Sequence, residues 1–140
     1  IGEHTAYLMA NLMQGVVNSG TGVRLRVKYG LKGEVAGKTG TTNDQSDGWF
    51  IGYTPSLTAG VWVGAEDRQV HFESLALGGG SNMALPIWGL FMQKVLADGT
   101  LGVSESDRFV PSGVKLELNC DGSDADAAHA SQDNESLYFD

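Results

Sequence analysis

The sequence has little of what marks several common classes of protein. Its 140 residues contain one cysteine, Cys120, which excludes a disulfide within the chain and leaves either a free thiol or a partner for a cysteine elsewhere. No run of about 18 apolar residues occurs, so the sequence predicts neither a membrane-spanning helix nor a signal peptide. A hydrophobic content of 41% is nevertheless enough for one modest core.

Basic residues are also scarce, with 9 Lys and Arg against 17 Asp and Glu, for a net charge of −8. Six of the acids and none of the bases fall within residues 121–140, which leaves 11 acids against 9 bases, or −2, in the first 120 residues. The first 120 residues have no basic stripe, which argues against nucleic acid as a partner. We predict that residues 1–119 form part of one domain and that residues 120–140 form an acidic, disordered tail.

Clusters of metal ligands are absent from the sequence as well. His4, His71 and His129 lie far apart and beside no cysteine or acid at ligand spacing. The run from Asp121 to Asp126 superficially resembles a calcium loop, but its glycine comes second and no glutamate closes a loop of about twelve residues. We therefore expect no metal and no organic cofactor.

Two segments have the apolar pattern of helices. Thr5–Ser19 places apolar residues at helical spacing and ends against Gly20, which predicts an amphipathic helix. Ala84–Ala97 is apolar around most of its circumference and predicts a buried helix, with Pro86 tolerable in its first turn. Residues 20–33 are glycine-rich and are predicted to be a loop. Its four cations either steer an anionic substrate or form a solvated surface: Arg24, Arg26, Lys28 and Lys32.

Three short segments favour strands: Glu34–Thr41, Gly48–Tyr53 and Leu57–Gly64. A short turn makes the last two antiparallel neighbours, so the sequence predicts an α+β fold in which a three-stranded antiparallel meander is flanked by helices. Leu57–Gly64 would have an unpaired edge, which we expect an upstream segment or a second copy of the chain to cover. Val114–Leu118 is a further strand candidate. We expect the strand aromatics to pack in the core or on a sheet face: Trp49, Phe50, Tyr53 and Trp62.

The residues suited to chemistry are concentrated in Ala36–Asp44, AGKTGTTND, for which two interpretations compete. A phosphate-binding loop needs four residues between its glycines and a helix directly after the Lys-Thr pair. Here Gly33 and Gly37 are separated by three residues, and Gly40 with a polar loop follows instead. The second interpretation is the Lys-Thr-Gly strand that is one signature of penicillin-binding proteins and serine β-lactamases.

Four strings, in order and spacing, resemble the bifunctional class A penicillin-binding proteins. They are GTG at 20–22, AGKTGTTND at 36–44, DGWFIGYTP at 47–55 and AGVWVG at 59–64. This resemblance covers residues 1–97 and implies that the chain is the C-terminal half of a penicillin-binding transpeptidase domain with a β-lactamase-like fold. Residues 98–140 fit the family less well, and within them Phe109-Val110-Pro111 is the segment that resembles it.

The residue types of this motif suit acyl transfer to a peptide that ends in a free carboxylate. Lys38 can supply a fixed cation to that carboxylate, and Thr39 and Thr41 add hydroxyl donors. Gly40 leaves room for an extended substrate to pair with the strand edge. By resemblance, the backbone N–H of Thr41 forms half of an oxyanion hole, and the N–H of the nucleophilic serine forms the other half. If Lys38 stood alone, a solvated surface lysine would be the better interpretation.

Two catalytic motifs of the family are missing. No Ser-x-Asn sequence occurs, and the one Ser-x-x-Lys match, Ser112–Lys115, follows the Lys-Thr-Gly strand instead of preceding it. We interpret this match as a coincidence and expect the nucleophilic serine to lie on upstream chain. The 140 residues alone should therefore be catalytically inactive.

The resemblance also implies a function for the parent protein. It would cross-link peptidoglycan by acyl transfer from a D-alanyl-D-alanine stem peptide through a serine ester, and β-lactams would inhibit it covalently. It would carry an upstream glycosyltransferase domain and lie in the bacterial inner membrane, facing the periplasm or cell exterior, with its membrane contact in the upstream region. The alternative is a non-enzymatic penicillin-sensing receptor domain that shares the Lys-Thr-Gly strand. The upstream sequence would distinguish the two.

Overall fold

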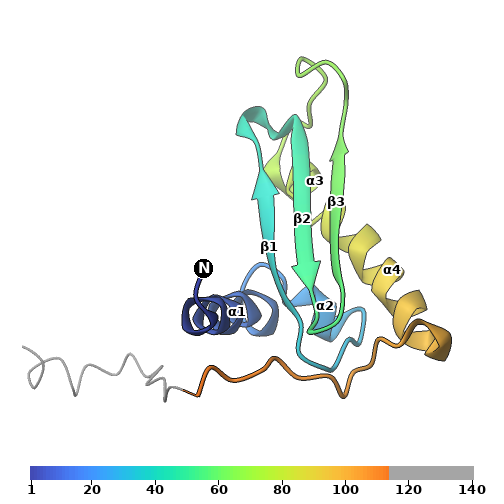
Figure 1. The fold of residues 1–140 in the computed structure, drawn as a ribbon. Coiled ribbons are helices and arrows are strands. Elements are labelled where there is room, and N and C mark those ends of the chain that lie inside the picture. The colour runs from blue at the N-terminus through green and yellow to red at the C-terminus, as the bar shows by residue number, and fades with distance from the viewer. Residues whose placement is uncertain (114–140) are drawn as a thin grey trace, which may run out of the picture.

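The computed structural model describes residues 1–113, which form a small sheet with helices beside it (Figure 1). The helices are α1 (Glu3–Asn18), α2 (Arg24–Val27), α3 (Leu75–Gly78) and α4 (Ala84–Ala97), the strands are β1 (Ala36–Thr41), β2 (Asp47–Tyr53) and β3 (Thr58–Gly64), and the 3-10 turns are η1 (Asn43–Gln45) and η2 (Gly99–Leu101). Within residues 1–113, no helix has both the length and the apolar character needed to cross a membrane. The predictions for Val114–Leu118, Cys120, His129 and the acidic tail lie outside the described residues.

The sheet is a meander in the order β1-β2-β3, and both neighbouring pairs are antiparallel. Its register sets Trp49 directly opposite Trp62. A tight turn joins β2 to β3, closed by a hydrogen bond from the Thr54 N–H to the Leu57 carbonyl at 2.8 Å, and so short a connection forces antiparallel pairing. The predicted α+β meander flanked by helices is confirmed, and each strand's bounds lie within two residues of those expected.

The bounds of the two long helices lie within two residues of those expected. The prediction that Ala84–Ala97 is a buried helix holds for one side only, because Ile87, Leu90 and Phe91 are 50%, 55% and 43% exposed. Residues 20–33 are not wholly a loop. They contain the helical turn α2, in which the Lys28 N–H donates to the Arg24 carbonyl at 2.9 Å. Leu25, at its centre, is fully buried. One apolar side chain between two arginines has no readable periodicity, so the turn is stabilised by the burial of Leu25 rather than by helix propensity. No element was predicted for residues 65–83, where α3 lies.

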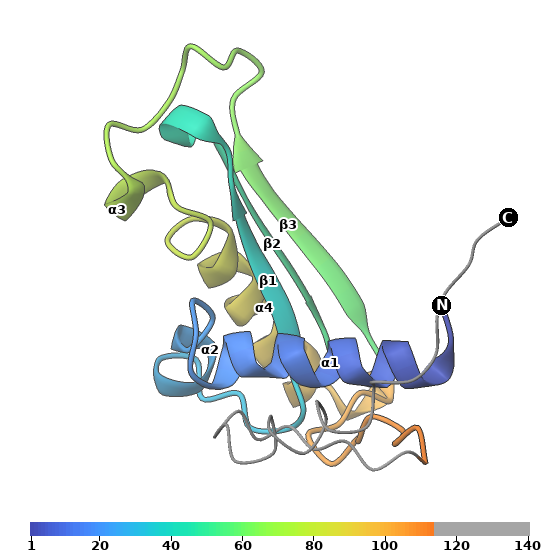
Figure 2. The same ribbon diagram turned by 90° about the vertical axis from the view of Figure 1, so that its left-hand side faces the viewer.

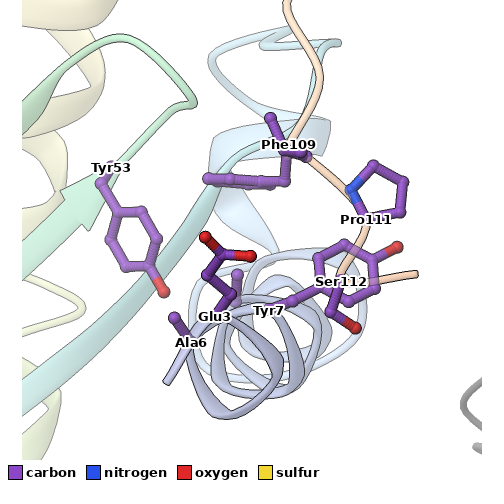
Figure 3. Close-up of a pocket in the computed structure, with 9 residues that line it drawn as sticks. Glu3, Ala6, Tyr7, Tyr53, Phe109, Pro111 and Ser112 are labelled. Atoms are coloured by element: carbon purple, nitrogen blue, oxygen red, sulfur yellow. The ribbon is translucent and has the colours of Figure 1, made fainter. Parts of the chain in front are cut away.

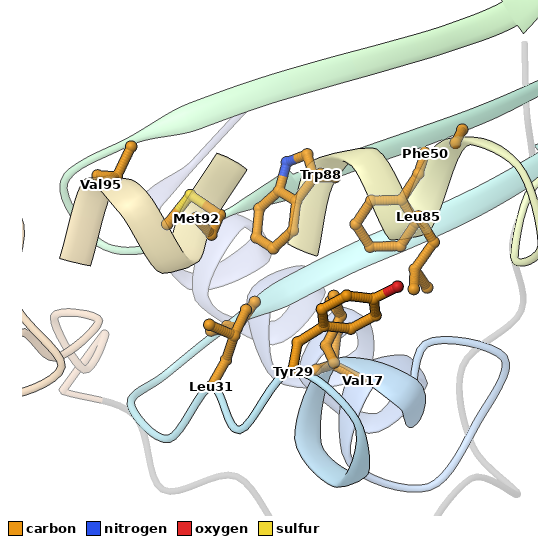
Figure 4. Packing of buried hydrophobic residues seen from close by; sticks show 11 residues of the cluster. Val17, Tyr29, Leu31, Phe50, Leu85, Trp88, Met92 and Val95 are labelled. Carbon is orange, nitrogen blue, oxygen red and sulfur yellow. The ribbon is translucent and has the colours of Figure 1, made fainter. Parts of the chain in front are cut away.

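Helix α4 covers one face of the sheet, called the core face below (Figures 2 and 4). Phe50 and Trp88 meet there edge to face with ring centroids 5.3 Å apart, and both are fully buried. The Trp88 indole N–H donates to the Ala59 carbonyl at 3.0 Å, which satisfies its only donor. Other buried members of this cluster come from α1, α4 and the chain between α1 and β1: Val17, Leu25, Tyr29, Leu31, Val35, Leu85, Met92 and Val95.

Glycines allow this close approach of α4. A Cβ at Gly52 would lie 2.6 Å from the Trp88 ring, and a Cβ at Gly89 would lie 2.8 Å from the Tyr29 ring. Both distances are shorter than real carbon contacts, so any side chain at either position would displace a ring from a closely packed core.

The opposite side of the sheet is called the open face below. Side chains of β2 and β3 that point to it remain exposed: Trp49 by 45%, Ile51 by 48% and Trp62 by 46%. At the end of β2, Tyr53 meets Phe109 edge to face with ring centroids 5.7 Å apart. The tryptophans therefore occupy a sheet face, as predicted, and that face is largely uncovered by residues 1–113.

Candidate active site

The Lys-Thr-Gly motif lies in β1, at one edge of the sheet (Figure 1). Within residues 1–113, β2 is the only strand that pairs with it. Lys38 is exposed and stands opposite Ile51, which places its side chain on the open face. The Lys38 Nζ donates to the carbonyl of Thr39 at 3.0 Å. The structure therefore places a cation beside a strand edge.

Thr39 connects this strand to the turn after α1. Its side chain is half-buried, and its Oγ1 lies 3.0 Å from the Oγ1 of Thr21. Thr21 is the middle residue of the GTG string at 20–22, so two of the strings that carry the family resemblance meet through their hydroxyl groups.

Thr41, at the end of β1, contacts the glycine run before α4. Its Oγ1 accepts a hydrogen bond from the Gly80 N–H at 3.1 Å. A Cβ at Gly80 would lie 2.3 Å from the Gly40 carbonyl oxygen and 2.5 Å from that of Trp49. The loop backbone therefore lies directly against β1 and β2, in a position that requires glycine.

The chain leaves β1 through a constrained turn. Asp44 and Gln45 have φ values of 57° and 53°, in the left-handed region that residues other than glycine rarely adopt. Thr42 stabilises the turn, because its Oγ1 lies 2.9 Å from the Ser46 hydroxyl and accepts from the Asp47 N–H at 3.0 Å. The backbone that follows the motif is thus held by several local hydrogen bonds.

Two cations of residues 20–33 are exposed, as a solvated surface requires, and also make specific contacts. Arg24 donates to the Ser81 carbonyl at 3.3 Å and to the Asn82 side-chain oxygen. The Lys28 ammonium lies 5.6 Å from the centre of the Tyr29 ring, within the range of a cation–π interaction.

Arg26 joins the end of α1 to the chain before β1. Its guanidinium donates to the Asn18 side-chain oxygen at 3.0 and 2.9 Å and to the carbonyls of residues 31–33. Partial burial lowers the pKa of Arg26, and the nearby Glu105 carboxylate opposes this effect. This side chain stabilises the local fold, a role that neither sequence interpretation of these cations included.

Ser112 lies elsewhere, in a cavity of about 500 Å³ beside the first turns of α1 (Figure 3). The lining includes Glu3, Tyr7, Tyr53 and Phe109 but none of residues 38–41. The Ser112 Oγ is 3.2 Å from the His4 Nδ1, while Lys115 lies outside the described residues. No group of three or more His, Cys, Asp or Glu residues within residues 1–113 is arranged to hold a metal ion.

The structure adds partners to the site that the sequence did not assign. Thr21, which precedes the motif in the sequence, contacts Thr39, and Gly80, which follows it, contacts Thr41. GTG was a readable signal, since it carries part of the resemblance, but its spacing does not reveal which strand its threonine meets. The run Gly78-Gly79-Gly80 was a weaker signal, consistent with a close backbone approach.

Comparison with known proteins identifies the family. Residues 1–74, more than half of the chain, match the model of the penicillin-binding protein transpeptidase domain. The chain belongs to this transpeptidase family. It is 42% identical over 102 residues to penicillin-binding protein 1A of Pseudomonas aeruginosa, covering 70% of this chain and 11% of that protein. It is 41% identical over 109 residues to penicillin-binding protein 1A of Aquifex aeolicus, covering 78% of this chain and 14% of that protein.

A solved structure has the same fold. Penicillin-binding protein 1A from Haemophilus influenzae superposes with a TM-score of 0.62 at 22% identity, over 83% of this chain and 16% of that chain. The predicted family is therefore confirmed by sequence, and the α+β architecture by structure. This chain spans 11% of the length of the Pseudomonas aeruginosa relative and 14% of the length of the Aquifex aeolicus relative.

Proposed function

We propose that this chain is the part of a peptidoglycan D,D-transpeptidase that binds the terminal carboxylate of the substrate. The observation that carries the proposal is the edge strand β1, which presents the Lys38 cation on the open face and the hydroxyls of Thr39 and Thr41 at the alternate positions. Charged and neutral donors fixed to a strand stabilise an anion without reorganising.

The substrate would bind as an added strand along β1. An extended stem peptide would pair with the strand edge beside Gly40, which has no side chain to obstruct it. A serine on upstream chain would attack the penultimate D-alanine carbonyl, forming an ester as terminal D-alanine leaves. An amine of a neighbouring stem would then displace the serine and form the cross-link. The Thr41 N–H would stabilise the oxyanion of each tetrahedral intermediate.

The uncovered sheet surfaces support a larger domain in the parent protein. We propose that upstream chain of the same transpeptidase domain covers the open face and the edge of β3, and that a second copy pairs with this edge when that chain is missing. In this proposal, the parent also carries a glycosyltransferase domain and a membrane anchor upstream, and faces the periplasm or cell exterior. Stem peptides and β-lactams would be its ligands.

The test is acylation of the full-length protein by a labelled penicillin. Lys38→Ala should slow acylation on the order of 10²- to 10³-fold, because it removes a charged contact that strengthens in the transition state. Thr39→Val should slow it less, because it removes a neutral donor. Lys94→Ala, an exposed lysine of α4, is the matched control. Rates equal to wild type for the Lys38 and Thr39 variants, in folded protein, would refute the proposal.

A second measurement concerns the 140-residue chain by itself. Incubated with benzylpenicillin, it should show no covalent adduct by intact mass, because the acylated serine is not in it. An adduct that disappears in Ser112→Ala would instead identify Ser112 as a nucleophile.

A further inference from the structure

We propose that Thr21 is a positioning residue of the transpeptidase site, whose hydroxyl donates to the Thr39 hydroxyl and so directs the Thr39 proton toward the substrate carboxylate. The inference rests on the proposed function, since it assigns a purpose within that site to the 3.0 Å contact between the two oxygens. It begins from the GTG string, to which the sequence assigns no chemical role.

The backbone holds Thr21 in place against the end of α1. The N–H groups of Gly20 and Gly22 both donate to the Val16 carbonyl, at 3.1 and 2.9 Å. A Cβ at Gly20 would lie 3.0 Å from the Val16 Cα, and a Cβ at Gly22 would lie 3.2 Å from the Val17 Cα. Larger residues on either side would push this turn away from the helix, so the two glycines fix where the threonine between them stands.

The same turn is tied to the other end of the motif. Arg24, two residues after Gly22, donates hydrogen bonds to the Ser81 carbonyl and the Asn82 side chain. The neighbouring Gly80 donates to the Thr41 hydroxyl at 3.1 Å. Hydrogen bonds therefore join β1 to the GTG turn, β1 to the glycine run before α4, and that run to Arg24. Together they limit how far Thr21 can move from Thr39.

The direction of the hydrogen bond decides what Thr39 can do. A threonine hydroxyl has one proton and two acceptor positions. If Thr39 donates to Thr21, it has no proton left for a carboxylate. If Thr21 donates, Thr39 is free to donate outward, and the bound anion strengthens both bonds by polarising the chain of hydroxyls. A carboxylate ligand therefore selects the order Thr21 to Thr39 to substrate.

The experiment measures acylation of the full-length protein by benzylpenicillin. Thr21→Val, which is nearly isosteric, should slow acylation about 3- to 10-fold, the loss expected for one neutral hydrogen bond. Thr21→Ser keeps the donor and should restore most of the rate. Thr58→Val, at the start of β3, is the matched control and should leave the rate unchanged.

A double-mutant cycle separates positioning from general support of the fold. Once Thr39 is valine, Thr21→Val should have no further effect on acylation, because its partner is gone. If Thr21→Val slows acylation as much in that background as in wild type, or has no effect in either, the inference is wrong while the proposed function stands. If neither Lys38→Ala nor Thr39→Val slows acylation, it is the proposed function that fails.

Discussion

The two faces of the sheet share strands but differ in what covers them. On the core face, Phe50 is fully buried against α4, whereas its sequence neighbours Trp49 and Ile51 on the open face are 45% and 48% exposed. Because side chains alternate along a strand, one step in sequence moves a residue from a complete core to an uncovered surface.

The contrast shows which contacts the chain can complete by itself. The core face is closed by α1, α4 and the chain between α1 and β1, all within residues 1–113. The open face carries the Lys38 side chain together with large apolar residues, a combination that marks an interaction surface more than an ordinary exterior. This supports our proposal that the catalytic half of the domain docks there.

The largest expected loss of stability comes from removing a buried side chain of the core face. In the 140-residue chain, Trp88→Ala should lower the free energy of unfolding by about 3 to 5 kcal/mol, because it leaves a cavity against Phe50. Trp49→Ala, on the open face, should cost about 1 kcal/mol or less, since half of its surface is already in water. Urea unfolding followed by circular dichroism measures both. Equal losses would mean that the two faces are not distinct.

A matched pair of glycines sharpens the same contrast. Gly52→Ala should destabilise the chain by about 1 to 3 kcal/mol, because its Cβ would lie 2.6 Å from the Trp88 ring. A Cβ at Gly60 would point to the open face, where the nearest atom lies 3.5 Å away on the Ile51 side chain. Gly60→Ala should therefore leave the stability nearly unchanged. Thermal unfolding midpoints of the two variants give the comparison, and a reversed order would contradict it.

The outer edge of β3 is unpaired within residues 1–113, and we expect it to cause weak self-association of the chain. Residues 58–64 contain no charged residue and no proline, the features that proteins use to protect an edge strand. We expect the 140-residue chain to form dimers or larger species as its concentration rises, measured by light scattering. Trp62→Lys should shift these toward monomer, with Lys94→Ala as a control. A monomer at every concentration would show that the edge needs no partner.

The sequence predicted the elements well and their contacts less well. Alternation and turn residues were enough for three strands, and the family strings placed Lys38 on the first of them. The pairing of Thr21 with Thr39 depends on tertiary packing between segments 18 residues apart, which no local pattern encodes. For α2 the reason was similar, since Leu25 is buried within the core cluster that it shares with residues of other elements rather than by its own turn. The boundary predicted at residue 119 stays a prediction.

The smallest expected effect is a pH dependence where the last described segment meets the β2–β3 turn, at the margin of both faces. Asp107 accepts hydrogen bonds from the Ser56 hydroxyl at 2.7 Å and the Ser104 N–H at 3.0 Å. These bonds, that of Ser56 first, hold the pKa of Asp107 below its ordinary value of 3.8. Because the folded pKa is the lower one, the stabilisation is present above the unfolded pKa and is lost as pH falls through the folded value.

We therefore expect the Ser104 amide resonance to titrate with a midpoint below 3.8, as the carboxylate is protonated and releases its donors. In Asp107→Asn this transition should disappear while the resonances of Phe50 and Trp88 stay unchanged, because the hydrogen-bond partners of this carboxylate are Ser56 and Ser104 and not residues of the core face. A midpoint at or above 3.8 would contradict the geometry at Ser56. A core shift in the same variant would instead show that the turn and the covered face are coupled.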